Sequence, residues 1–123
     1  MTERIEEFTL EGKNFIYYDL SGFQNLEEYV QLIETAKSGI VKYPKHSALT
    51  ITNIKNIRFD SSVKVAWAEW TAFNSHYVKY GAIFGADGIK KIMVNSALNI
   101  SGRDNLNFVF TKEEAIEWLL KQK

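Results

Sequence analysis

Hydrophobic and polar positions alternate in short stretches near the start of the chain. Apolar side chains recur within residues 5–10 and again within residues 15–20. Residues 11–14 lie between these stretches and have the Glu-Gly-Lys-Asn composition of a hairpin turn. The pattern therefore predicts an antiparallel pair of strands at the beginning of the fold.

Apolar positions then recur three and four residues apart, which is the spacing of a helix with one buried face. The first such series is Leu26, Tyr29, Val30, Ile33, Ala36 and Ile40. Pro44 lies just past its end, where a helix stop is expected. The second series is Val63, Ala66, Trp67, Trp70, Phe73, Asn74 and Tyr77. We expect this second face to pack on a sheet, with Lys64, Glu69 and Thr71 lying off it.

The remaining stretches complete an alternation of strands and helices. Residues 47–54 alternate apolar with polar, residues 80–85 form a short apolar run between glycines, and residues 107–110 read as a last strand. Helices are predicted over residues 89–100 and after the cap at Thr111. The order β-β-α-β-α-β-α-β-α predicts an α/β fold, with a mixed, largely parallel sheet covered by helices. We expect one domain over residues 1–123.

Composition and charge exclude several functional classes. The 123 residues contain no cysteine, which rules out disulfide frameworks, zinc-thiolate sites and cysteine nucleophiles. The 15 basic residues balance 15 acidic ones, and this balance argues against nucleic-acid binding, which depends on contacts to phosphate. No apolar run approaches the roughly 20 residues of a membrane span. The acidic N-terminus has no apolar signal segment, so we expect a cytoplasmic protein.

Candidate catalytic and metal-binding residues are few. His46 and His76 are the only histidines, and neither has a partner at ligand spacing. No serine, histidine and carboxylate follow a recognisable catalytic order. We therefore expect a non-enzymatic protein without a metal or a cofactor. Asp60-Ser61-Ser62 can act simply as a helix cap, because each of these side chains accepts a hydrogen bond from a free backbone N–H.

Residues 49–62 nevertheless resemble a known family. This stretch ends in Asp60-Ser61-Ser62 and looks like the central strand and Asp-Ser-Ser motif of STAS domains, the family of bacterial anti-sigma factor antagonists. The order of elements is similar along the whole chain. Leu20-Ser21-Gly22 resembles the Leu-Thr-Gly that ends the second strand of the family, and Ser101-Gly102 matches its C-terminal part. Residues 81–119 look especially like the SpoIIAA-like branch, whose members mostly have no assigned function.

The resemblance implies a signalling module with a phosphorylation switch. In the antagonists, a partner anti-sigma kinase phosphorylates the second serine of Asp-Ser-Ser-Gly, and Ser62 matches that serine. The implied surface for a protein partner comprises Gly22, Asn25, Asp60 and Ser61. Two positions depart from the family pattern. Val63 replaces the glycine, so we expect a β-branched side chain where the kinase would approach, and Asn25 replaces an acidic residue.

Aromatic side chains leave a second hypothesis open. Trp67 and Trp70 could line an apolar cavity, which would make the chain a carrier of a small molecule or a lipid. Their helical spacing favours a place in the core. The aromatic content of 14% is also compatible with rings at a homodimer interface, where Trp and Tyr are enriched.

Overall fold

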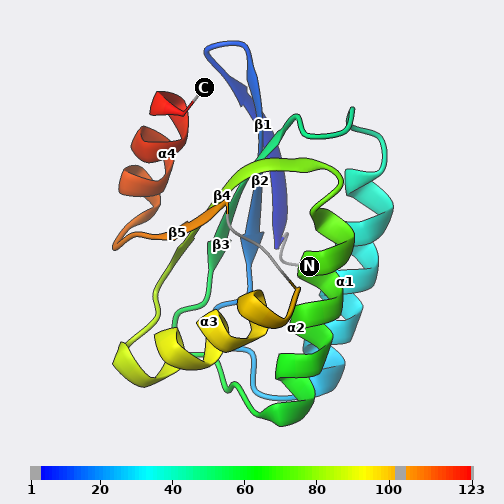
Figure 1. Cartoon of the computed structure of the whole chain (residues 1–123), viewed down its shortest axis with the longest axis vertical. Helices are drawn as coiled ribbons and strands as arrows, with labels where there is room; N and C mark the ends of the chain where they lie inside the picture. The colour runs from blue at the N-terminus through cyan, green and yellow to red at the C-terminus, as the bar shows by residue number, and fades with distance from the viewer. Residues whose placement is uncertain (1–3, 102–104, 123) are drawn as a thin grey trace.

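Strands and helices alternate in the predicted order in this computed structural model, which describes residues 4–101 and 105–122 (Figure 1). Gly102, which belongs to the family resemblance, lies outside the described residues. The elements are β1 (Ile5–Leu10), β2 (Lys13–Asp19), α1 (Leu26–Ile40), β3 (Ala48–Asn53), α2 (Ser61–Asn74), β4 (Val78–Phe84), α3 (Gly88–Ser101), β5 (Leu106–Phe108) and α4 (Lys112–Lys121).

The five strands form one mixed sheet in the order β1-β2-β3-β4-β5. Strands β1 and β2 are the antiparallel hairpin, and the other three neighbouring pairs are parallel. Right-handed crossovers that step across a sheet in one direction place their helices on the same face. Accordingly α1, α2 and α3 lie on one face of the sheet, and only α4 lies on the other (Figure 1). The predicted fold class is confirmed.

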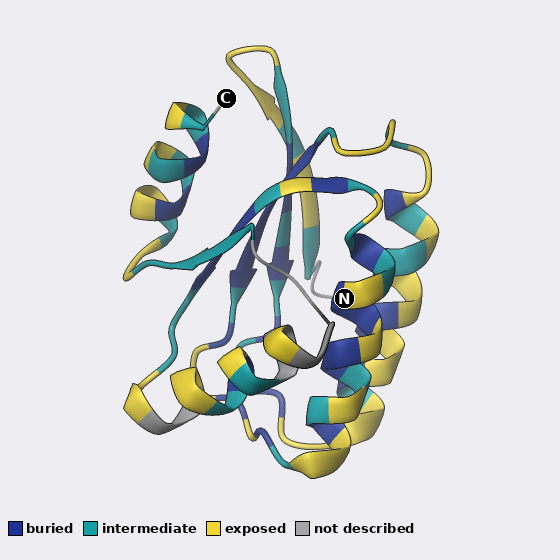
Figure 2. Ribbon diagram, in the orientation of Figure 1, coloured by how far each residue is buried: buried dark blue, intermediate teal, exposed yellow. Residues whose placement is uncertain are grey.

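Alternate residues of the strands face opposite sides of the sheet and supply two hydrophobic layers. Figure 2 shows that much of the sheet is buried. On β2, Ile16 and Tyr18 pack with α1 and α2, whereas Phe15 packs beneath α4. Strand β3 is buried on both sides from Ala48 to Thr52. Because α4 is short, the layer beneath it is the smaller one, and Ala115 and Leu119 are its two fully buried helical residues.

The second helix buries a broader face than its periodicity predicts. Thr71, expected off the buried face, is buried, and its hydroxyl donates to the Ala68 carbonyl at 3.1 Å. This correction has a packing cause, because α2 contacts α1 and α3 and also packs on the sheet, where Trp70 meets Tyr18 edge to face. The helix ends at Asn74, so Tyr77 belongs to the turn before β4. There the Tyr77 carbonyl accepts hydrogen bonds from the N–H groups of Ser47 and Ala48.

The last strand is shorter than predicted. Strand β5 ends at Phe108, although the Val109 N–H still donates to the Ile83 carbonyl at 2.9 Å. Phe110 is 86% exposed in the connection to α4, where no strand or helix covers it. The cap at Thr111 is confirmed, since its hydroxyl accepts the Glu114 N–H at 3.1 Å. The apolar composition of residues 107–110 therefore predicted a strand that extends beyond the observed end at Phe108.

Gly85 fixes the approach of the end of β4 to the loop after β3. Its φ is +97°, and a Cβ atom built there would lie 2.7 Å from the backbone nitrogen of Lys55. Gly12 in the hairpin turn also has a positive φ, +76°, but a Cβ atom there would meet nothing within 4 Å. A side chain at Gly12 would thus cause only backbone strain, whereas one at Gly85 would cause backbone strain and a steric clash.

We predict that Gly85→Ala destabilises the protein more than Gly12→Ala does. The shared cost of a left-handed alanine is about 1 kcal/mol. The contact with Lys55 should add at least about 1 kcal/mol, as overpacking does elsewhere. Urea unfolding of both variants measures the difference, and equal losses would contradict the tight approach at Gly85.

Candidate functional site

Three loops meet where the parallel strands end. The carboxyl ends of β2, β3 and β4 lie at one edge of the sheet, and the chain turns there into α1, α2 and α3 (Figure 1). In open α/β sheets this edge is the usual place for binding. All residues that the family resemblance implies for the partner surface belong to the first two of these loops or to the first turn of α2.

Backbone hydrogen bonds join the β2–α1 loop to the β3–α2 loop. The Gly22 N–H donates to the Lys55 carbonyl at 2.9 Å, and the Arg58 N–H donates to the Phe23 carbonyl at 2.8 Å. The Tyr29 hydroxyl of α1 then donates to the Arg58 carbonyl at 2.8 Å. These bonds hold the two loops as one surface.

Gly22 and Gln24 complete the joined loops. Gly22 has a φ of +78°, a conformation that other residues rarely adopt, and a Cβ atom there would point into open space. The Gln24 side-chain amide donates to the Asn56 carbonyl at 3.1 Å. Gly22 therefore shapes the surface through its backbone conformation, whereas Gln24 adds a side-chain link between the loops.

Asn25 is the N-cap of α1. Its side-chain oxygen accepts the Glu28 N–H at 3.0 Å, while the Glu28 carboxylate accepts the Asn25 N–H at 3.3 Å. This reciprocal pair is a capping box. The residue that replaces an acidic side chain of the family pattern thus has a structural role here.

Asp60 caps α2 in a similar way. One carboxylate oxygen accepts the Val63 N–H at 3.1 Å, and the Arg58 guanidinium lies 3.8 Å from the other. The Val63 hydrogen bond lowers the pKa of Asp60, and so do hydrogen bonds from Ser62 and the positive charge of Arg58. The carboxylate is therefore held in its charged form at the start of the helix, where the dipole also favours negative charge.

Ser61 and Ser62 are the first two residues of α2, and both are exposed. The Ser62 hydroxyl is close enough to the Asp60 carboxylate to help lower its pKa. Val63 is 1% exposed and packs into the core. The burial of Val63 confirms its predicted place on the buried face of the second helix, because the first turn of α2 directs this position inward.

Sequence reasoning missed a second cluster at the same edge. The Arg4 guanidinium donates to the carbonyls of Asp19 and Ser21 at 3.1 and 2.9 Å and lies over the Phe23 ring at 4.6 Å. The Asp19 carboxylate accepts both the N–H and the hydroxyl of Ser21. An aspartate two residues before a serine after a strand is an Asx-turn signal. The role of Arg4 depends on a long-range contact and left no such signal.

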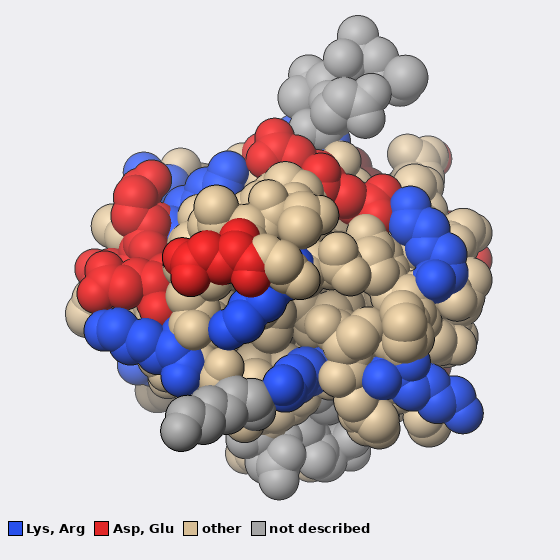
Figure 3. Space-filling model, turned by 90° about the horizontal axis from the view of Figure 1, so that it is seen from above, with Lys and Arg blue, Asp and Glu red and all other residues tan. Residues whose placement is uncertain are grey.

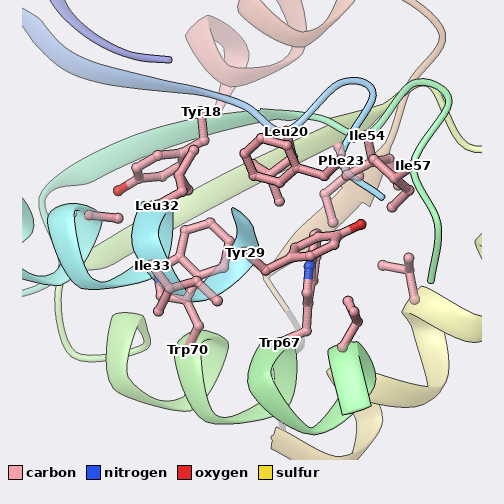
Figure 4. Packing of buried hydrophobic residues seen from close by; sticks show 14 of the residues in the cluster. Tyr18, Leu20, Phe23, Tyr29, Leu32, Ile33, Ile54, Ile57, Trp67 and Trp70 are labelled. Atoms are coloured by element: carbon pink, nitrogen blue, oxygen red, sulfur yellow. The ribbon is translucent and has the colours of Figure 1, made fainter. Parts of the chain in front are cut away.

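Trp67 and Trp70 lie in the core between α2 and the sheet (Figure 4). Their rings meet edge to face, and the cavity beside them has a volume of about 20 Å³. That volume holds about one water molecule. Neither buried indole N–H group has a hydrogen-bond partner among the described residues, and Thr50 and Thr52 also line the cavity. The cavity is thus small and partly polar, and it offers no space for an acyl chain in this conformation.

Three further observations concern the distribution of charge, the grouping of metal ligands and the length of the helices. Basic and acidic side chains lie interspersed on the end of the molecule shown in Figure 3. Within residues 4–101 and 105–122, no three His, Asp or Glu residues are grouped as metal ligands. None of the helices in these residues is long and apolar enough to cross a membrane.

Comparison with known proteins relates the chain to one fold. Neither protein-family models nor curated proteins match the sequence. Among solved structures, the chain is similar to an uncharacterized protein of the DUF3478 family from Shewanella loihica PV-4, which has a SpoIIAA-like fold. The TM-score is 0.66 at 19% sequence identity, over 94% of this chain and 91% of that one. The chain therefore has a SpoIIAA-like fold, and an identity this low establishes the fold alone.

The lowered pKa of Asp60 predicts how its cap depends on pH. Because its folded pKa lies below the unfolded value, Asp60 contributes stability above the unfolded pKa of about 4 and loses it as pH falls through the folded pKa. We predict that Asp60→Ala is destabilising at neutral pH and that its deficit relative to wild type shrinks in acid. Chemical denaturation across the acidic range measures this deficit.

Asp60→Asn is the matched control, because asparagine caps helices but does not titrate there. It should remain more stable than Asp60→Ala at every pH. A deficit of Asp60→Ala that stays constant from neutral to strongly acidic pH would show that the charge of Asp60 does not contribute.

Proposed function

We propose that the chain is a non-enzymatic interaction module that docks a protein partner at the strand ends. The docking surface comprises Gly22, Gln24, Asn56, Arg58, Ser61 and Ser62. The proposal includes a cytoplasmic setting, which we expect from the N-terminal sequence. It also includes a partner resembling an anti-sigma kinase, which the family resemblance implies. The SpoIIAA-like fold supports it at the level of architecture only, because one fold can carry several functions.

The observation that carries the proposal is the joining of two loops beneath exposed serines. The hydrogen bonds from Gly22 to Lys55 and from Arg58 to Phe23 fix the loop backbones before any partner arrives. A surface ordered in advance loses less conformational entropy on binding. Ser61 and Ser62 project from this fixed frame at a helix end that is open to solvent.

Phosphorylation of Ser62 would change the electrostatics of the docking surface directly. The modification adds a charge of about −2 and removes the hydroxyl proton that helps to lower the pKa of Asp60. Two negative groups would then adjoin each other, with Arg58 in reach of the Asp60 carboxylate at 3.8 Å. We expect Arg58 and the N–H groups of the first turn of α2 to stabilise the phosphate. On a chain with no net charge, this is a large local change.

The carrier hypothesis receives no comparable support at Trp67 and Trp70. A cavity of about 20 Å³ would have to expand several-fold to accept a lipid. Such an expansion would separate rings that pack edge to face. The docking hypothesis needs no rearrangement of the core, and it is therefore the function that the geometry favours.

We predict that Ser62→Asp changes the recovery of a protein partner from a native extract. The added carboxylate lies beside Asp60 and alters the charge that a partner meets. Ser38→Asp is the matched control, because Ser38 is also exposed on a helix but lies in the second half of α1. Affinity capture with quantitative mass spectrometry compares the three proteins, and Ser38→Asp should behave like wild type.

Three outcomes would each contradict a part of the proposal. Capture of no specific protein by wild type would remove the docking function. Equal capture by wild type and Ser62→Asp would remove the switch at Ser62 while leaving docking in place. If the recovered partner is only a second copy of the chain, the module is a homodimer instead.

A further inference from the structure

Strand β5 is the outermost strand of the sheet, and within the described residues it pairs on one side only, with β4 (Figure 1). Asn105, just before the strand, accepts the Gly81 N–H at 3.1 Å through its carbonyl. Val109, just after the strand, donates its N–H to the Ile83 carbonyl at 2.9 Å. The backbone bonds to β4 therefore run from residue 105 to residue 109.

The other side of β5 carries backbone groups without a partner. Successive residues of a paired strand direct their N–H and C=O groups to opposite sides. Because Asn105 and Val109 bond to β4, the N–H and C=O groups of Leu106 and Phe108 point away from the sheet. No hydrogen bond between described residues uses these groups, and both residues are partly exposed. This edge can therefore pair with a further strand.

The unpaired edge also has no charge. Residues 105–110 read Asn-Leu-Asn-Phe-Val-Phe and contain neither a charged residue nor a proline. Natural edge strands use charged side chains or proline to prevent pairing with another chain. The opposite edge follows this rule, because β1 contains Glu6 and Glu7, which form ion pairs with Lys112 and Lys42. Of the two edges of the sheet, β5 is thus the one that charge does not protect.

Phe110 adds an exposed ring next to the same edge. Its side chain is 86% exposed, more than any other large hydrophobic residue in the described part of the chain. Burial of such a ring against a partner is favourable, and aromatic side chains are enriched at protein interfaces. The nearest cation on this side is that of Lys91, which lies 5.2 Å from the centre of the Phe108 ring. Phe108 packs with the core on the face beneath the first three helices, so this cation lies over a face of the sheet and not along its edge.

We infer that two copies of the chain pair through β5 in an antiparallel arrangement, which joins their sheets into one. A second copy fits because it brings an edge with the same unpaired groups and with no charge to repel the first. A two-fold axis at Asn107 places Leu106 of each copy opposite Phe108 of the other, and these residues then exchange N–H···O=C bonds. Pairing through β1 would instead bring the carboxylates of two copies together. The dimer uses no residue of the docking surface and does not rest on the proposed docking function.

Sedimentation velocity of the purified chain over a range of concentrations tests the dimer. The junction is short, so we expect a reversible equilibrium between monomer and dimer with a dissociation constant of roughly 10–100 µM. Phe110→Lys should weaken dimerisation at least about tenfold, because it removes the ring and adds a positive charge in each copy. The exposure of Phe110 means that this variant should still fold. Val41→Lys is the matched control: Val41 is 50% exposed at the end of α1, and its replacement should leave dimerisation unchanged.

Hydrogen exchange followed by NMR assigns the interface. The amides of Leu106 and Phe108 should exchange rapidly in dilute protein and become protected as the concentration rises, since pairing engages both N–H groups. The amides of Glu7 and Thr9 are the internal control, because the register with β2 directs them to the outer side of β1. Their exchange should be the same at all concentrations.

Four results would overturn the inference. A monomer at every concentration up to the millimolar range would remove the dimer. A dimer that leaves the exchange of Leu106 and Phe108 unchanged would place the interface elsewhere, and protection of Glu7 and Thr9 instead would place it at β1. Equal dimerisation of Phe110→Lys and wild type would show that the uncharged edge with its exposed ring does not determine the pairing.

Discussion

Strand β3 lies at the centre of the sheet and is hydrogen bonded in parallel to β2 on one side and β4 on the other. Parallel pairing places the ends of all three strands at the same edge, and each strand then needs a helix to return the chain. The strand pairing therefore brings the loops after β2 and β3 together, independently of the residues in those loops. The backbone bonds from Leu20 to Asn53 and from Gly22 to Lys55 continue the same ladder beyond the strands. The docking surface is thus an extension of the sheet.

Some residues of the docking loops hold the surface in shape, whereas others are exposed on it and available to a partner. Asn25 and Asp60 use their side chains to cap α1 and α2. Ser61 and Ser62 are exposed and contribute little to the core. A substitution at a cap therefore alters folding and binding together, whereas one at Ser61 changes mainly the surface. Ser62 belongs partly to both groups, because its hydroxyl helps to lower the pKa of the capping Asp60 carboxylate.

The sequence predicts those parts of the fold that depend on local patterns. Alternation identified the hairpin, and the cap residues Asp60 and Thr111 identified two helix starts. The burial of Thr71 was missed because it depends on packing between helices, which periodicity on one helix does not contain. Arg4 was missed because its partners Asp19 and Ser21 are brought to it by the antiparallel pairing of β1 with β2.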